Sequence, residues 1–132
     1  MRQAVICLVL LAFAVAWLGR GAAPAYAVKG FHDAFVAAYD KADSEDAKDK
    51  AFAAAVEKAK CNICHQGKVK KNRNDYGKAL ASLIEKTDAD DKEKILAALK
   101  KVEAKHVDPK DEKSPTFGER IKAGKLPVEL KK

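Results

Sequence analysis

Two cysteines and a histidine within five residues are the side chains of this chain best suited to hold a prosthetic group. Cys61 and Cys64 are three positions apart, about one helical turn, and His65 follows directly. Two thiols at this spacing can add to the two vinyl groups on one edge of a porphyrin, and the histidine then lies under the ring. The spacing therefore predicts one covalent haem c held by Cys61 and Cys64, with His65 as the proximal iron ligand.

A Cys-x-x-Cys pair has other uses, which include half of a zinc site, a redox-active dithiol and a structural disulfide. Zinc would need two further ligands, and the chain has no second cysteine pair. A thioredoxin-like dithiol would need a βαβ setting, whereas the hydrophobic pattern here is helical nearly everywhere. Haem attachment is the favoured interpretation, and a dithiol or disulfide stays open as the alternative.

The second axial ligand is harder to assign from the sequence. Many haem proteins use a methionine thioether there, but Met1 is the only methionine of the chain. His106 lies four residues beyond Val102 and is expected to extend the apolar face of a helix, so it is the first candidate for the distal ligand. His32, four residues before Val36, is the second candidate. A five-coordinate iron, or ligation by water, lysine or tyrosine, stays open.

The N-terminus has the pattern of a secretory signal peptide. A short positive start precedes fifteen apolar residues at 4–18, fewer than the twenty or so that span a bilayer, and Ala25-Tyr26-Ala27 fits the A-x-A cleavage signal. We expect residues 1–27 to be removed, which leaves residues 28–132 as one exported, periplasmic domain with no membrane span. An uncleaved N-terminal anchor is the alternative. Cys7 lies in the signal, so the exported domain keeps only Cys61 and Cys64.

Composition suggests that the haem would also be structural. Without residues 1–27 the formal net charge falls from +7 to +5, and only 21 of 105 residues are Val, Ile, Leu or Phe. That fraction is close to the range in which chains tend to stay disordered. A buried porphyrin would supply the missing apolar surface.

The periodicity of apolar residues predicts an all-α fold, a small single domain of about five helices around the haem. The first helix is expected near residues 31–41, and the second begins after Asp43 or Ser44 and runs directly into Cys61. The third helix is expected to begin after the cap Asn74, and its inner face is Tyr76, Leu80, Leu83 and Ile84. The fourth is expected to begin with Asp90 and Glu93 as a capping box, and its inner face is Ile95, Leu96, Leu99 and Val102. The fifth is expected to begin at Ser114-Pro115 and to end at Gly124, with Phe117, Ile121 and Leu126 as its apolar residues.

A cluster of basic residues follows the motif. Lys68, Lys70, Lys71 and Arg73 are expected to surround an exposed haem edge and to steer an acidic redox partner toward it. The alternative is a solvated loop that only keeps the protein soluble. Nucleic acid is not an expected partner, because many acidic residues are interspersed and no aromatic residues alternate with the cluster.

With this motif at residues 61–65, an exported and all-helical chain resembles the monohaem c-type cytochromes. Residues 74–80, 115–118 and 124–127 also look like segments of short exported cytochrome-c-domain proteins. The resemblance implies thioether attachment at Cys61 and Cys64 and axial ligation by His65. The chain departs from the common pattern because it lacks a distal methionine and has no proline between His65 and His106.

The leading functional hypothesis is a periplasmic electron-transfer protein, which is not an enzyme. One alternative is a haem sensor or small-ligand-binding protein with an open sixth coordination position. Another is a haem subunit of a larger redox complex, or a weak peroxidase, for which the sequence offers no clear distal acid–base pair. The chain has no glycine-rich phosphate loop and no serine–histidine–acid set.

Overall fold

The part of the chain that the computed structural model describes, residues 29–69 and 71–130, is helical and contains no strand. The expected all-α class and single small domain are therefore confirmed. The predicted signal peptide at residues 1–27 and Lys70 of the basic cluster lie outside the described residues. Among the described residues, no helix is both long and apolar enough to cross a bilayer.

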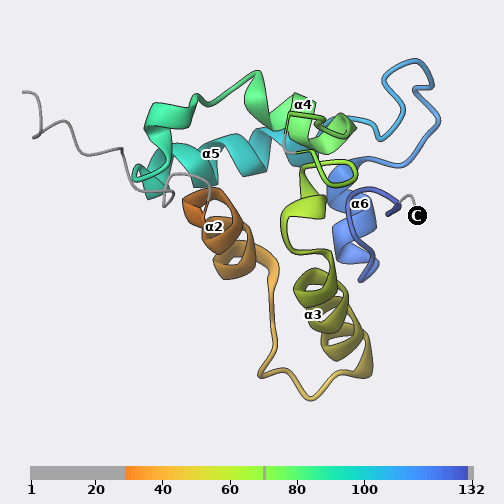
Figure 1. Ribbon diagram of the computed structural model, residues 1–132. Coiled ribbons are helices and arrows are strands. Elements are labelled where there is room, and N and C mark those ends of the chain that lie inside the picture. The colour runs from red at the N-terminus through yellow and green to blue at the C-terminus, as the bar shows by residue number, and fades with distance from the viewer. Residues whose placement is uncertain (1–28, 70, 131–132) are drawn as a thin grey trace, which may run out of the picture.

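One helix, α5, organises the others (Figure 1). The helices α2, α4 and α6 all pack against α5, whereas α3 leads into the short 3₁₀ segment η2. A second 3₁₀ segment, η3, precedes α5. Their bounds are α2 Lys29–Tyr39, α3 Ala47–Ala59, η2 Lys60–Ile63, α4 Asp75–Ala81, η3 Lys86–Asp88, α5 Lys92–Glu103 and α6 Phe117–Lys122.

Three aromatic rings connect α2, α4 and α6 in the core. The ring of Tyr76 lies edge-on to Phe35 at 5.9 Å between centroids and to Phe117 at 5.2 Å. All three side chains are almost completely buried. Edge-to-face pairs add stabilisation beyond the area they bury, so Tyr76 holds together segments that are far apart in the sequence.

Three helices begin later than the sequence predicts. The side chain that caps each one accepts a hydrogen bond from the first helical turn, and Thr116 forms a full capping box with Glu119. The predicted starts were wrong because several capping residues lie close together there, and helix packing determines which one is used. The observed caps are Asp46, Asp91 and Thr116, in place of Asp43 or Ser44, Asp90, and Ser114.

The ends of the helices also differ from prediction. Asn74 caps α4 as expected, but α4 ends at Ala81. Leu83 and Ile84, which were predicted on its inner face, therefore lie after the helix. Leu96 was expected in the inner face of α5, yet it is 42% exposed. The helix α5 ends at Glu103, and His106 therefore lies beyond it and does not extend its apolar face.

Candidate functional site

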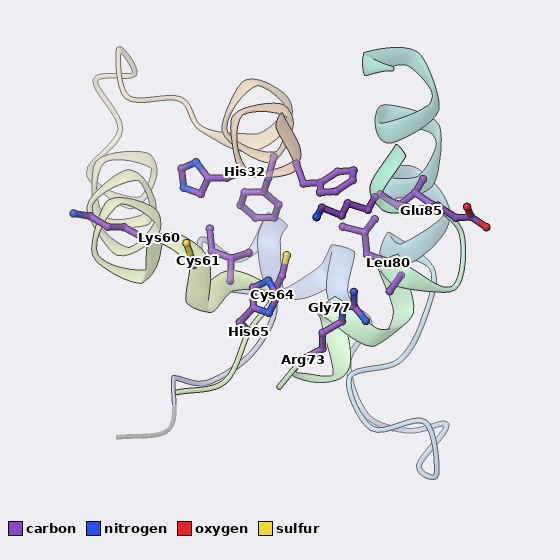
Figure 2. A pocket seen from close by; sticks show the side chains of 15 residues that line it. His32, Lys60, Cys61, Cys64, His65, Arg73, Gly77, Leu80 and Glu85 are labelled. Carbon is purple, nitrogen blue, oxygen red and sulfur yellow. The ribbon is translucent and has the colours of Figure 1, made fainter. Parts of the chain in front are cut away.

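An open pocket of about 230 Å³ lies between α2, η2 and α4 (Figure 2). The three residues predicted to hold haem, Cys61, Cys64 and His65, all line this pocket, and so does His32. In Figure 2, His32 comes from the α2 side and His65 from the side of η2. The other walls are mainly apolar, and their side chains are Phe31, Phe35, Ile63, Leu80, Ala81 and Ile84.

A sharp turn at Lys60 sets the direction of the motif. Lys60 has φ 48° and ψ −122°, a conformation that L-residues rarely adopt, and it ends α3. Within the turn that follows, the backbone N–H of His65 donates to the carbonyl oxygen of Cys61 at 3.0 Å. The motif therefore begins in the separate 3₁₀ segment η2, which ends at Ile63 with Cys64 as its cap, and the expectation that the second helix runs directly into Cys61 was wrong. The unusual backbone conformation of Lys60 turns the chain away from the axis of α3, at some cost in strain.

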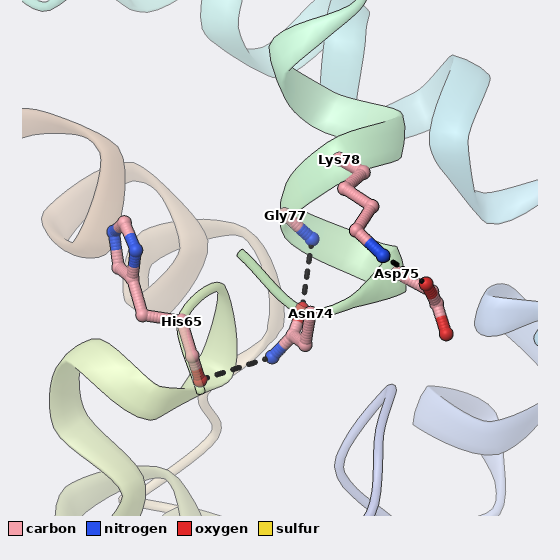
Figure 3. Close-up of polar contacts among 5 residues, drawn as sticks. All are labelled: His65, Asn74, Asp75, Gly77 and Lys78. Carbon is pink, nitrogen blue, oxygen red and sulfur yellow. Dashed lines mark hydrogen bonds and ion pairs between the residues drawn. The ribbon is translucent and has the colours of Figure 1, made fainter. Parts of the chain in front are cut away.

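Asn74 fastens this turn to α4 (Figure 3). Its side-chain amide donates to the carbonyl oxygens of Asn62 at 3.1 Å, Ile63 at 3.0 Å and His65 at 3.3 Å. Its Oδ1 accepts from the backbone N–H of Gly77 at 2.9 Å. The sequence predicted the cap, but the contacts to the motif are between residues nine to twelve positions apart and have no local signal.

Backbone contacts bring α4 still closer to the motif. The backbone N–H of Asn74 donates to the carbonyl oxygen of Cys64 at 3.1 Å. Gly77 lies so near the same oxygen that a Cβ at this position would overlap it. Glycine is needed here for the close approach rather than for an unusual φ.

The basic cluster forms a loop that folds back on itself. His65 pairs with Arg73 as an isolated antiparallel bridge, and the N–H of Gln66 donates to the carbonyl oxygen of Asn72 at 2.7 Å. This pairing brings Arg73 to the wall of the pocket, whereas Lys68 and Lys71 lie exposed in the loop. Of the four predicted docking residues, the structure therefore brings one to the pocket and places two on the adjacent surface.

The two cysteines differ in environment. Cys61 is exposed, whereas Cys64 is partly buried. Burial, with a smaller contribution from Cys61, raises the pKa of the Cys64 thiol to about 12, although Arg73 acts in the opposite direction. The thiol of Cys64 is therefore protonated at neutral pH.

The two candidates for the distal ligand occupy different places. The imidazole of His32 lines the pocket beside the motif, and its Nε2 is buried with no hydrogen-bond partner among the described residues. His106 lines a different pocket, together with Lys105 and Phe117, and its Nδ1 donates to the carbonyl oxygen of Ser114 at 2.6 Å. The structure therefore brings His32, and not His106, to the cysteines.

The donor chemistry of the pocket suits a haem. Two thiols and two imidazoles lie along the walls of an apolar space, and the basic residues Arg73 and Lys86 also line it and can accompany the propionate groups. Among residues 29–69 and 71–130, no three His, Cys, Asp or Glu side chains converge into a metal-binding group.

Comparison of the chain with protein-family models, with curated proteins and with solved structures finds no match. The residues of the pocket are therefore the basis on which a function can be assigned.

Proposed function

We propose that this protein is an exported, periplasmic electron carrier with one covalently attached haem c. The observation that supports this most is the placement of Cys61, Cys64 and His65 together on the wall of one apolar pocket. When bound, haem supplies an iron that alternates between the ferric and ferrous states. The protein itself makes and breaks no substrate bonds.

The chain's own residues attach and orient the group. The thiols of Cys61 and Cys64 would hold the haem through two thioethers, each made by adding S–H across one vinyl double bond, which needs no oxidant. A ring nitrogen of His65 would bind the iron. Asn74 holds the carbonyl oxygen of His65, which fixes the backbone that carries the ligand. The apolar side chains of the pocket would pack against the ring.

The basic loop is the proposed docking surface for an acidic redox partner. Lys68 and Lys71 are exposed next to Arg73 at the pocket wall, and the apolar side chain of Val69 is 54% exposed between them. Positive charge steers the encounter, and an exposed apolar side chain near its centre can be buried on contact. This arrangement suits brief association of the kind that electron carriers need.

Intact mass of protein exported from cells that attach haem to c-type cytochromes tests the proposal. We expect the mass of the mature chain plus one haem, which persists under denaturing conditions because thioethers are covalent. The double variant Cys61→Ser, Cys64→Ser should lose the haem, whereas each single variant should keep one thioether. Free thiols or a Cys61–Cys64 disulfide in the mature wild-type protein would refute covalent haem attachment.

Electron transfer needs its own measurement. The loaded protein should be reduced and reoxidised reversibly at an electrode without loss of haem. Binding of carbon monoxide to the ferrous protein at full occupancy would instead favour the small-ligand-binding alternative, because it requires an open coordination position.

A further inference from the structure

We infer that His32 provides the second axial ligand to the iron, in addition to His65. This inference rests on the proposed function and concerns the same pocket. It replaces His106, which the sequence favoured, with a residue that the fold brings to the motif. The ligand would complete the coordination of the iron through two imidazoles.

The first support is the state of the imidazole. The side chain of His32 is 32% exposed, but its Nε2 is buried and has no hydrogen-bond partner among the described residues. Leaving a buried polar atom unpaired costs about 1–3 kcal/mol, so such atoms are uncommon in folded proteins. An iron atom that accepts the lone pair of Nε2 would remove this cost.

The second support is the neighbour of the other ring nitrogen. The Oδ1 atom of Asp33 lies 3.6 Å from Nδ1 of His32. A carboxylate on that side favours the tautomer in which Nδ1 carries the proton, and Nε2 then presents a lone pair. Histidines that bind metals commonly have such a partner for their second nitrogen.

The third support is that contacts at both ends of α2 hold it against neighbouring segments. Near the start of α2, Gly30 lies so close to the carbonyl oxygen of Ala89 that a Cβ would overlap it. Ala89 lies just before α5. At the other end of α2, the hydroxyl of Tyr39 donates to Oε1 of Glu103 at 2.7 Å. Between them Phe35 is buried in the core. His32 is therefore presented by an anchored helix rather than by a loop, which is how ligands are held in place.

Two imidazoles on the iron have a functional consequence. They would leave no coordination position for a small ligand and would favour a low-spin iron of fairly low potential. His32 ligation would therefore account for an electron carrier that contains no methionine outside its predicted signal peptide.

Optical and electron paramagnetic resonance spectra of the ferric, haem-loaded protein test this inference. We expect a low-spin wild type and a largely high-spin His32→Ala variant, whose low-spin signal returns when imidazole is added. The matched control is His106→Ala, which removes another half-buried histidine and should stay low-spin. Lys86→Ala removes a further potential donor from the pocket wall and should also stay low-spin. Circular dichroism checks that each variant is folded.

The outcomes separate this inference from the proposed function. If haem is covalently attached but the wild type is high-spin, or if His32→Ala stays low-spin, His32 is not the ligand and the electron-carrier proposal survives. Conversion to high spin in His106→Ala or Lys86→Ala alone would also overturn it. Absence of covalent haem from the wild type would instead refute the proposed function itself.

Discussion

The α-carbon of Gly77 lies against the carbonyl oxygen of Cys64, so closely that no side chain fits between them. This contact seats the N-terminal turn of α4 directly on the Cys-x-x-Cys-His segment. It connects the packing of the fold to the geometry of the proposed haem site, because anything that moves α4 must also move the backbone of Cys64.

Gly77→Ala should destabilise the protein by about 2–3 kcal/mol. Alanine favours a helix over glycine by about 0.5–1 kcal/mol, but the overlapping atom belongs to the backbone and cannot turn aside, so overpacking dominates. The control is Gly118→Ala in α6, whose new Cβ would lie 3.0 Å from the nearest atoms of Glu103 and should cost less than about 1 kcal/mol. Chemical unfolding measures both, and equal stability of the two variants would contradict the predicted order.

Substitutions of Asn74 should separate the cap of α4 from its hold on the motif. Asn74→Ser keeps an acceptor for the N–H of Gly77 and loses the amide donors, whereas Asn74→Asp keeps the cap and places a carboxylate against carbonyl oxygens. We expect both to lower the yield of haem-loaded protein, the aspartate more strongly because like partial charges repel. Asp91→Ala, which removes the cap of α5, should cost about 1 kcal/mol of stability without that loss of yield.

If Asn74→Asp were loaded with haem as fully as the wild type, its amide donors would not position the motif. A matching loss of yield in Asp91→Ala would show that yield follows overall stability instead.

Lys60→Gly should leave stability unchanged or raise it by about 1 kcal/mol. Lys60 has a positive φ of 48°, and strained conformations of this kind cost of order 1–3 kcal/mol for residues with a side chain. Glycine relieves the strain but loosens the unfolded chain. Lys58→Gly, inside the last turn of α3, should instead destabilise by about 1 kcal/mol. Melting temperatures measure the contrast, and equal destabilisation by both substitutions would remove the case for strain at Lys60.

Tyr39→Phe should destabilise the protein in a pH-dependent way. Partial burial acts to raise the pKa of Glu103, but hydrogen bonds from Lys100 and Tyr39 hold it below its ordinary value. A carboxylate with a lowered folded-state pKa contributes stability above the ordinary carboxyl range, and this contribution is lost as pH falls through the folded pKa. We therefore expect a cost of about 1–2 kcal/mol at neutral pH that shrinks as the pH falls through the lowered folded-state pKa of Glu103. Urea unfolding at a series of pH values measures this cost.

Tyr76→Phe is the control for this prediction. The hydroxyl of Tyr76 is buried with no hydrogen-bond partner among the described residues, so its removal should be neutral or stabilising and independent of acidic pH. A constant cost of Tyr39→Phe between neutral and acidic pH would show that the Glu103 carboxylate does not contribute through this bond.

Reversing charge on the basic loop should slow association with an acidic redox partner. Lys68→Glu with Lys71→Glu changes two exposed side chains beside the pocket, and rim charges act mainly on the rate of encounter. The rate for the wild type should fall steeply with salt, since exposed charges are screened beyond about 8 Å at physiological ionic strength. Stopped-flow kinetics with the physiological partner measure both effects, and the haem spectrum should not change.

The matched control is Lys110→Glu with Lys113→Glu, two exposed lysines in the loop between α5 and α6, far from the motif in the sequence. This double variant should leave the association rate close to that of the wild type. A rate that does not depend on salt would mean that the lysines near the pocket only keep the protein soluble.

Local patterns in the chain were sufficient for the class of fold and for the proposed chemistry. Apolar residues at helical spacing predicted the helices, since Phe35, Tyr76, Leu99 and Phe117 are all buried. Helix starts were less certain because neighbouring capping residues compete, and their energies differ by less than the packing that decides between them. The spacing of Cys61, Cys64 and His65 is also a local property, so the motif could be recognised without any tertiary contact.

The distal side of the site depends on tertiary packing. Periodicity placed His106 on an inner face, but α5 ends at Glu103 and the side chain of His106 turns to the Ser114 carbonyl oxygen. His32 reaches the pocket because α2 packs on α5, a contact between segments about sixty residues apart, as in the Tyr39–Glu103 hydrogen bond. The spacing of residues along one helix does not show which other helix it packs against. That pairing depends on how the apolar faces of several helices are buried together.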